Sequence, residues 1–154
     1  MIKLHIVLYQ PEIPQNTGNI ARTCAITNTA LHLIRPLGFT LSDKYLKRAG
    51  LDYWKHLNLQ IYNSLDELSE KNKDKQMYYI TTKGEHTYSN IKFSKDDFLI
   101  FGKETAGLPS ELLKKQKEFT LKIPMKDGQR SLNLSNSVAI VLYEGLRQTG
   151  FNFV

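Results

Sequence analysis

The fold is decided by the stretch FLIFGKETAGLP, residues 98–109. Its first four residues are an apolar run typical of a buried strand, and Pro109 suits the first turn of a helix that we expect to reach about Lys117. Gly102 and Gly107 lie in the connecting loop, where glycine lets a backbone approach a ligand closely. The loop matches neither standard glycine-rich nucleotide fingerprint. The stretch predicts a strand, a loop and a helix, and the loop either binds a ligand or is a tight structural turn.

The same alternation of strands and helices continues on both sides of this stretch. Further strands, where apolar residues alternate or cluster, are expected at 2–9, 31–34, 57–62, 77–82 and 119–123. Further helices are expected from about Ile20, at 42–49, at 64–73 and at 135–149. This order predicts a single α/β domain over residues 1–154, with a mainly parallel, Rossmann-like sheet flanked by helices. Such sheets bind ligands beyond the carboxyl ends of their strands.

Two of the expected helices carry signals at their ends. Residues 64–67, SLDE, form a capping box ahead of a polar surface helix. The last helix is apolar in succession over 138–143, can be capped by Ser135 or Asn136 at its start, and ends at Gly150. Because this helix is apolar on most sides, it needs burial on most sides, either in the core or in a subunit interface.

The composition argues against several classes of protein. The chain has 154 residues, 41% of them hydrophobic and 23% charged, with no run long enough to span a membrane and no signal peptide, so we expect a cytoplasmic globular protein. A single cysteine, Cys24, cannot form an internal disulfide, and the four histidines are too scattered to suggest a metal site. The net charge of +6 favours polyanionic partners such as nucleic acid, although an ordinary basic enzyme would show it too.

Three loops hold more glycine, proline and small polar residues than short connections require. They span residues 11–19, 102–109 and 124–136. In the third loop, Leu132 and Leu134 interrupt a polar run. Capping of the last helix explains one or two of the polar residues, but not Arg130, Ser131 and Asn133 together. These loops are therefore the candidate functional segments.

Segments in and around these loops resemble the three motifs of SPOUT-class RNA methyltransferases. They read PEIPQNTGNIAR at 11–22, FGKETAGLP at 101–109, and IPM at 123–125 with RSLNLSN at 130–136. The chain is most similar to the small members of this class that methylate the ribose 2′-hydroxyl of the tRNA wobble nucleotide, cytidine or a modified uridine. RAGLDY at 48–53 and TTKG at 81–84 are also similar to that subfamily, so the resemblance covers essentially the whole chain.

The resemblance implies a C-terminal trefoil knot, S-adenosyl-L-methionine as methyl donor, the tRNA anticodon stem-loop as substrate and a homodimer, with neither metal nor membrane. The implied cofactor-binding residues are Ile80, Thr81, Gly102, Gly107, Ile123, Ser131, Leu132 and Leu134. The implied catalytic residues are Arg22, Asn16 and Tyr143, the last near the dimer interface. Because basic side chains supply most sequence-independent affinity for RNA, the expected phosphate contacts are Lys44, Lys47, Arg48 and Arg130.

The chemistry of these side chains limits their roles. The resemblance implies that Arg22 assists or effects deprotonation of the 2′-hydroxyl. Because guanidinium stays protonated in proteins, we favour a role in which Arg22 binds the phosphate beside the ribose and orients it, with a phosphate oxygen or water as the alternative proton acceptor. Asn16 can donate and accept at once, which suits either holding the ribose or ordering the loops. Glu104 either pairs with Arg22 or organises its own loop. Tyr143 is explained equally well by core packing.

Two other functions stay open at this point. A non-catalytic RNA-binding module could keep the fold and lose the transfer chemistry, although the complete third motif weighs against it. A nucleotide-dependent oxidoreductase on a doubly wound sheet is disfavoured, because Pro11 and Pro14 follow the first strand where a glycine-rich dinucleotide loop is expected.

Overall fold

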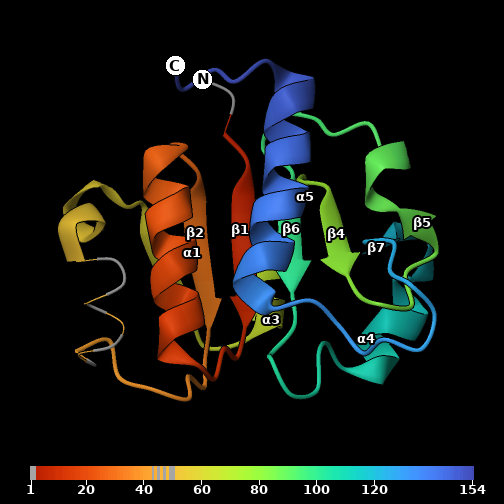
Figure 1. Ribbon diagram of the computed structural model, residues 1–154, viewed down its shortest axis with the longest axis horizontal. Helices are drawn as coiled ribbons and strands as arrows, with labels where there is room; N and C mark the ends of the chain where they lie inside the picture. Colours follow the sequence, from red (N-terminus) through yellow and green to blue (C-terminus); the bar gives the residue numbers. More distant parts are fainter. Residues whose placement is uncertain (1–2, 43, 45, 47, 49–50) are drawn as a thin grey trace.

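A computed structural model describes residues 3–42, 44, 46, 48 and 51–154. In this part of the chain, seven strands form one sheet in the order β3-β2-β1-β6-β4-β7-β5, with every pair parallel (Figure 1). The strands are β1 (His5–Tyr9), β2 (Ala30–Ile34), β3 (Leu59–Tyr62), β4 (Met77–Ile80), β5 (His86–Thr87), β6 (Phe98–Phe101) and β7 (Thr120–Lys122). The predicted parallel α/β sheet is confirmed, and the very short β5 is the strand that its sequence did not reveal.

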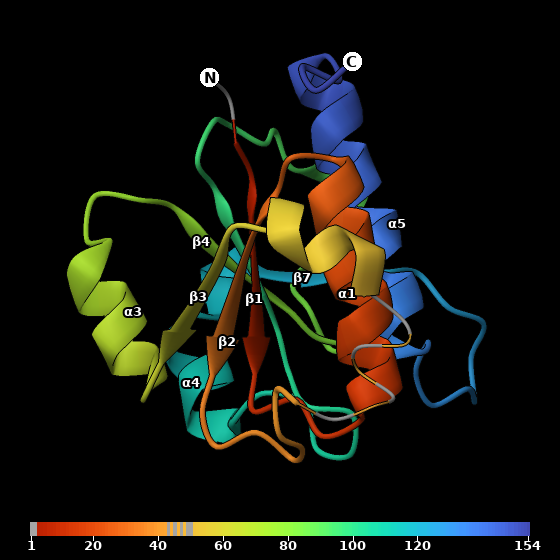
Figure 2. The same ribbon diagram turned by 90° about the vertical axis from the view of Figure 1, so that its left-hand side faces the viewer.

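Helices cover both faces of the sheet. The helices are α1 (Pro14–Ile26), α3 (Leu65–Lys71), α4 (Ser110–Lys115) and α5 (Leu134–Thr149), with short 3-10 turns η1 (Leu51–His56), η2 (Tyr88–Asn90) and η3 (Lys117–Phe119). Figures 1 and 2 show α1 and α5 side by side on one face, with α3 and α4 on the other. The result is three layers, as expected for parallel strands joined by helical crossovers.

The central strands are buried on both faces because helices lie on both sides of them. In β1, Ile6 and Leu8 pack toward α1 and α5, while Val7 packs toward α3 and α4. The same division holds in β6, where Leu99 faces the first cluster and Ile100 the second. The burial of successive side chains along this strand therefore alternates less than predicted, since a central parallel strand has no solvent face.

Two helix starts differ from the prediction. Helix α1 begins at Pro14 instead of near Ile20, because a proline needs no N–H partner in the first turn. The cap of α5 is Asn133, whose Oδ1 accepts hydrogen bonds from the backbone N–H groups of Ser135 (2.9 Å) and Asn136 (3.3 Å). The expected caps at Ser135 and Asn136 are therefore wrong, since both residues already lie inside the helix.

Other end signals are confirmed. Ser64 Oγ accepts from the backbone N–H of Glu67 at 3.1 Å, which is the first half of the expected capping box. Helix α5 ends at Gly150, whose φ of 93° is the left-handed conformation that glycine adopts without strain. The expected helix at 42–49 lies partly outside the described residues, although Lys44, Leu46 and Arg48 have helical backbone.

Helix α5 is less completely buried than its sequence suggests. Val138, Val141 and Leu142 are fully buried against the sheet and α1, whereas Ile140 and Tyr143 keep 36% and 42% of their surface exposed. Core packing therefore does not explain Tyr143. An apolar strip of α5 lacks a covering element within the described part of the chain.

A histidine pair is buried between the sheet and α3. His5 Nδ1 lies 2.9 Å from His32 Nε2, and both rings pack on Phe98, with the His5 ring stacked at 4.2 Å. Burial, with a smaller contribution from the neighbouring His5, lowers the pKa of His32 to about 3. Burial also lowers the pKa of His5, against the opposing effect of Asp96. His32 is therefore neutral in the folded protein at all moderate pH values.

We expect stability to fall on acidification because of His32. The unfolded chain binds a proton near pH 6.5 and the folded chain only near pH 3, so the stabilisation is complete above pH 6.5 and is lost as the pH falls. Urea unfolding should show a loss of about 2–3 kcal/mol from this group between pH 7 and 4.5. His32→Gln should flatten this dependence, and exposed His86→Gln should keep it. Equal pH dependence in both variants would exclude His32 as the cause.

Candidate functional site

A large cavity opens at the carboxyl ends of β4, β6 and β7. Its volume is about 890 Å³, within the range of small-molecule and cofactor sites. Its walls come from the ends of those strands, the loop after β6 and the loop before α5. All eight residues expected to bind a cofactor line it, namely Ile80, Thr81, Gly102, Gly107, Ile123, Ser131, Leu132 and Leu134. The structure therefore brings together residues that are far apart in the sequence.

Other lining residues had no signal in the sequence. Ser110, Leu113 and Lys114 of α4 and Lys117 of η3 line the cavity, although the sequence predicts only a helix there. Met125 also lines it, inside the third motif. The position of α4, directly after the loop that leaves β6, is the sequence signal that could have indicated that this helix borders the cavity.

Gly102 lines the cavity and also has a structural role within its own loop. A Cβ added there would lie 2.2 Å from the carbonyl carbon of Gly107, so the missing side chain lets the loop fold back on itself. The backbone N–H of Gly107 donates to the carbonyl oxygen of Lys103 at 2.9 Å across this turn. Gly107 has a φ of +66°, which favours glycine. The two glycines shape the loop that forms the cavity wall.

Glu104 joins this loop to the start of α1. Its carboxylate accepts hydrogen bonds from the backbone N–H groups of Glu12 (2.9 Å) and Ile13 (2.7 Å). In return, the Glu12 carboxylate accepts from the backbone N–H (3.0 Å) and the hydroxyl (2.7 Å) of Thr105, and these bonds lower the pKa of Glu12. Of the two roles left open for Glu104, the structure supports the organisation of the loops.

Asn16 extends this network to the third motif. Its Nδ2 donates to Glu104 at 3.3 Å, and its Oδ1 accepts from Asn133 Nδ2 at 3.1 Å. Asn133 in turn caps α5. Because Asn16 is only 7% exposed and both ends of its amide are engaged, the geometry favours ordering of the loops over direct contact with a ribose.

Two of the three expected catalytic residues lie away from the cavity. Arg22 is exposed on α1, with its guanidinium carbon 5.0 Å from the centre of the Tyr53 ring. Tyr143 is exposed on α5, where its ring centre lies 6.5 Å from that of Phe151. Neither residue lines the cavity. One chain therefore does not bring the expected catalytic arginine to the expected cofactor site.

The expected RNA contacts are also divided. Arg130 lines the cavity, whereas Lys44 and Arg48 are exposed on the segment that precedes η1 and do not line it. Lys47 lies outside the described residues. The four basic side chains therefore do not form one site around the cavity of a single chain.

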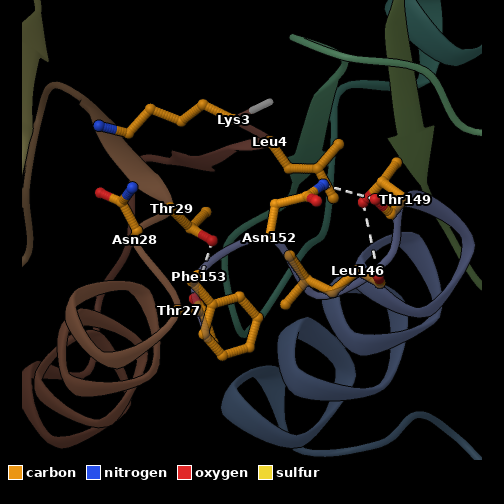
Figure 3. Close-up of a pocket in the computed structure, with 9 residues that line it drawn as sticks. All are labelled: Lys3, Leu4, Thr27, Asn28, Thr29, Leu146, Thr149, Asn152 and Phe153. Carbon is orange, nitrogen blue, oxygen red and sulfur yellow. Dashed lines mark hydrogen bonds between the residues drawn. The ribbon is translucent and has the colours of Figure 1, made fainter. Parts of the chain in front are cut away.

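A second cavity is too small for an organic ligand. It lies between the ends of α1 and α5 near the start of β1, and its volume of about 10 Å³ has room for about one water molecule (Figure 3). The side chains of Thr149 and Asn152 at its wall already donate to backbone carbonyls of α5. Among the described residues, no three histidine, cysteine or acidic side chains group as metal ligands, and no helix could cross a membrane.

Comparisons with known proteins agree on one family. Residues 3–143 match the SpoU rRNA Methylase family. The tRNA (cytidine(34)-2′-O)-methyltransferase of Methylovorus glucosotrophus is 50% identical over 147 residues, covering 95% of this chain and 96% of that protein. A Listeria monocytogenes protein provisionally given the same name is 63% identical, covering 96% of this chain and 89% of that protein.

A solved structure agrees with these relatives. It is described as giving insights into "the 2-OH methylation of C/U34 on tRNA" and is 48% identical to this chain. It superposes with a TM-score of 0.91 and covers 96% of this chain and 97% of the other. The chain therefore shares its fold over nearly its full length with that protein.

We expect Glu104→Ala to destabilise the protein, because two backbone N–H groups and Asn16 lose their acceptor. The free energy of unfolding should fall by about 1–3 kcal/mol, measured by chemical denaturation. Glu111→Ala is the matched control, since Glu111 is an exposed acid on α4 whose side chain pairs only with Lys114 in the described part of the chain. That variant should stay within about 0.5 kcal/mol of the parent. Equal free energies of unfolding for the two variants would show that the Glu104 hydrogen bonds do not stabilise the protein.

Proposed function

The chain belongs to the SpoU rRNA Methylase family, and from this premise we propose that it methylates the ribose 2′-hydroxyl of nucleotide 34, the wobble nucleotide of tRNA. The knotted SPOUT fold follows from the same membership. One observation carries the proposal. A cavity at the carboxyl ends of parallel strands is lined by all three motifs of the resemblance, which converge from widely separated parts of the chain.

The methyl donor in this proposal is S-adenosyl-L-methionine, which supplies an electrophilic methyl group when bound. The cavity has the volume for it, and its lining combines aliphatic side chains with loop backbone. Leu132 is 39% exposed in an otherwise polar loop, an arrangement explained by an apolar face of a ligand such as adenine. Ile80 and Ile123 can enclose the same flat base, while backbone amides and carbonyls bind its edges.

The substrate is proposed to be the anticodon loop of tRNA, with cytidine or uridine at position 34. Relatives at 45–63% identity carry names that specify cytidine 34, and one related structure is described for C/U34. Lys44, Lys47, Arg48 and Arg130 remain the predicted phosphate contacts. We propose that residues 1–154 form a single domain. Because its proposed substrate is tRNA, we also propose that this domain acts in the cytoplasm.

Arg22 is proposed to orient the ribose by binding its neighbouring phosphate. Its charge is permanent and its planar fork matches the phosphate oxygens, so it can hold the 2′-oxygen in line with the transferred methyl without losing its own proton. The hydroxyl proton then passes to a phosphate oxygen or to water. Correct alignment accounts for a large share of such a rate enhancement.

A homodimer would complete the site. Arg22 lies on the half of the molecule that carries η1, β2 and β3, whereas the cavity lies at β6, β4 and β7 toward the other edge of the sheet. Next to Arg22, α1 exposes 51% of Ile26, and α5 exposes Ile140 and Tyr143. These apolar side chains suit a two-fold interface, across which Arg22 of one protomer would face the cavity of its partner.

We expect the purified chain to transfer labelled methyl groups from S-adenosylmethionine to nucleotide 34 of a tRNA anticodon stem-loop. Leu132→Asp should weaken cofactor binding at least about ten-fold in calorimetry, because a charge replaces an apolar contact in the cavity. Leu41→Asp is the control, since Leu41 is similarly exposed at 36% and lies outside the cavity. Methylation at another nucleotide, or equal affinities of the two variants, would contradict the proposal.

We expect two inactive variants to restore activity when mixed, if the site is shared between protomers. Arg22→Ala has an intact cavity, and Leu132→Asp has an intact arginine, so a mixed dimer contains one complete site. Random mixing in equal amounts should recover about a quarter of the parent rate, since half of the dimers are mixed and each has one good site of two. The assay requires a cofactor concentration that fills the parent cavity but leaves the weakened cavity of Leu132→Asp largely empty. Activity equal to the sum of the separate variants would exclude a shared site.

A further inference from the structure

Arg22 differs from Arg147 and Arg35 in its contacts. Arg147 donates two hydrogen bonds to the Glu144 carboxylate, both at 2.9 Å, and Arg35 donates to Asn63 at 3.2 Å. Outside residues 51 and 52, no described group accepts a hydrogen bond from the Arg22 guanidinium, and no described carboxylate lies within 4 Å of it. Its recorded contact is with the face of the Tyr53 ring, at 5.0 Å.

A contact with a ring face leaves the donors of an arginine available. The five N–H groups of guanidinium lie in its plane and point outward, so a ring stacked on the face of the group leaves them available. Tyr53 can therefore restrain the group without occupying the edge that would bind a phosphate. A carboxylate partner would restrain it equally well, but would occupy that edge and cancel its charge.

Tyr53 is held by a well-packed turn. It lies in η1, which packs against α1, and its neighbour Trp54 packs against the main hydrophobic core together with Leu57. The backbone N–H of Leu57 donates to the carbonyl of Trp54 at 3.1 Å, which closes the turn. The backbone that carries the aromatic ring is therefore anchored to the core, beside the long side chain of Arg22.

We propose that Tyr53 is a positioning residue for the methyl transfer, whose ring holds the Arg22 guanidinium at one orientation with its N–H edge open to an RNA phosphate. The inference rests on the proposed function, because it needs Arg22 to act on the substrate. It assigns no contact between Tyr53 and the reacting atoms. The hydroxyl of Tyr53 is not required, since the attraction comes from the ring.

The test is single-turnover methylation of a tRNA anticodon stem-loop at saturating cofactor, over a range of RNA concentrations. Tyr53→Phe should keep the rate of the parent, because it keeps the ring. Tyr53→Leu should lower the rate at saturating RNA by about two- to five-fold, the factor that an exposed cation–π contact represents. Its cofactor affinity should not change. Tyr88→Leu, at another half-buried tyrosine in a 3-10 turn, is the control for lost packing and should transfer at the parent rate.

A double-mutant cycle separates action through Arg22 from direct contact with RNA. In an Arg22→Lys background, Tyr53→Leu should cost less than in the parent, because the planar group that the ring holds is gone. The same loss in both backgrounds would overturn the proposal and would indicate that Tyr53 stacks on a nucleobase. Equal slowing by Tyr53→Phe and Tyr53→Leu would also overturn it.

A second measurement keeps the shape of the side chain constant. Phenylalanine with increasing numbers of ring fluorines, placed at position 53, progressively weakens the negative face of the ring with little change in volume. The rate should fall in step with fluorination, and a constant rate would reject the cation–π contact even if Tyr53→Leu does not fold. Parent protein that fails to methylate nucleotide 34 would overturn the proposed function instead, so the two failures are distinguishable.

Discussion

The hydrogen bonds of the Glu104 carboxylate are the interaction on which the site depends. Parallel strands deliver their loops to one edge of a sheet, but that alone does not fix the loops relative to one another. Glu104 binds the backbone at the start of α1, and Asn16 carries the connection to Asn133, which caps α5. Three segments separated by up to 117 residues therefore form one wall of the cavity.

The same interaction explains why Asn16 is buried at little cost. A buried amide is destabilising unless its donors and acceptors are paired, and Asn16 has partners at both ends. The glycines serve the same geometry, since Gly102 lets the loop pass within van der Waals contact of its own backbone. One connected network of hydrogen bonds thus shapes the loop, caps α5 and forms the cavity wall.

The order of the strands places the cavity and Arg22 on different halves of the molecule. The cavity belongs to the half of the sheet that contains β6, β4 and β7, whereas Arg22 and Tyr53 belong to the half that carries η1. Helix α5 packs its buried side on the core and leaves Ile140 and Tyr143 exposed. The homodimer that we propose would cover this strip and bring Arg22 of one protomer to the cavity of its partner.

The sequence by itself determined the α/β class and the main strands, and its motifs predicted residues that line the large cavity, because periodicity and motif residues are local signals. It left open the role of Glu104 and whether Tyr143 packs in the core. Only the tertiary structure showed that Glu104 caps the region before α1, that His5 meets His32, and that Arg22 lies over Tyr53, away from the cavity. Each of these is a contact between distant segments, whose partners are chosen by strand order and helix packing instead of by neighbouring residues.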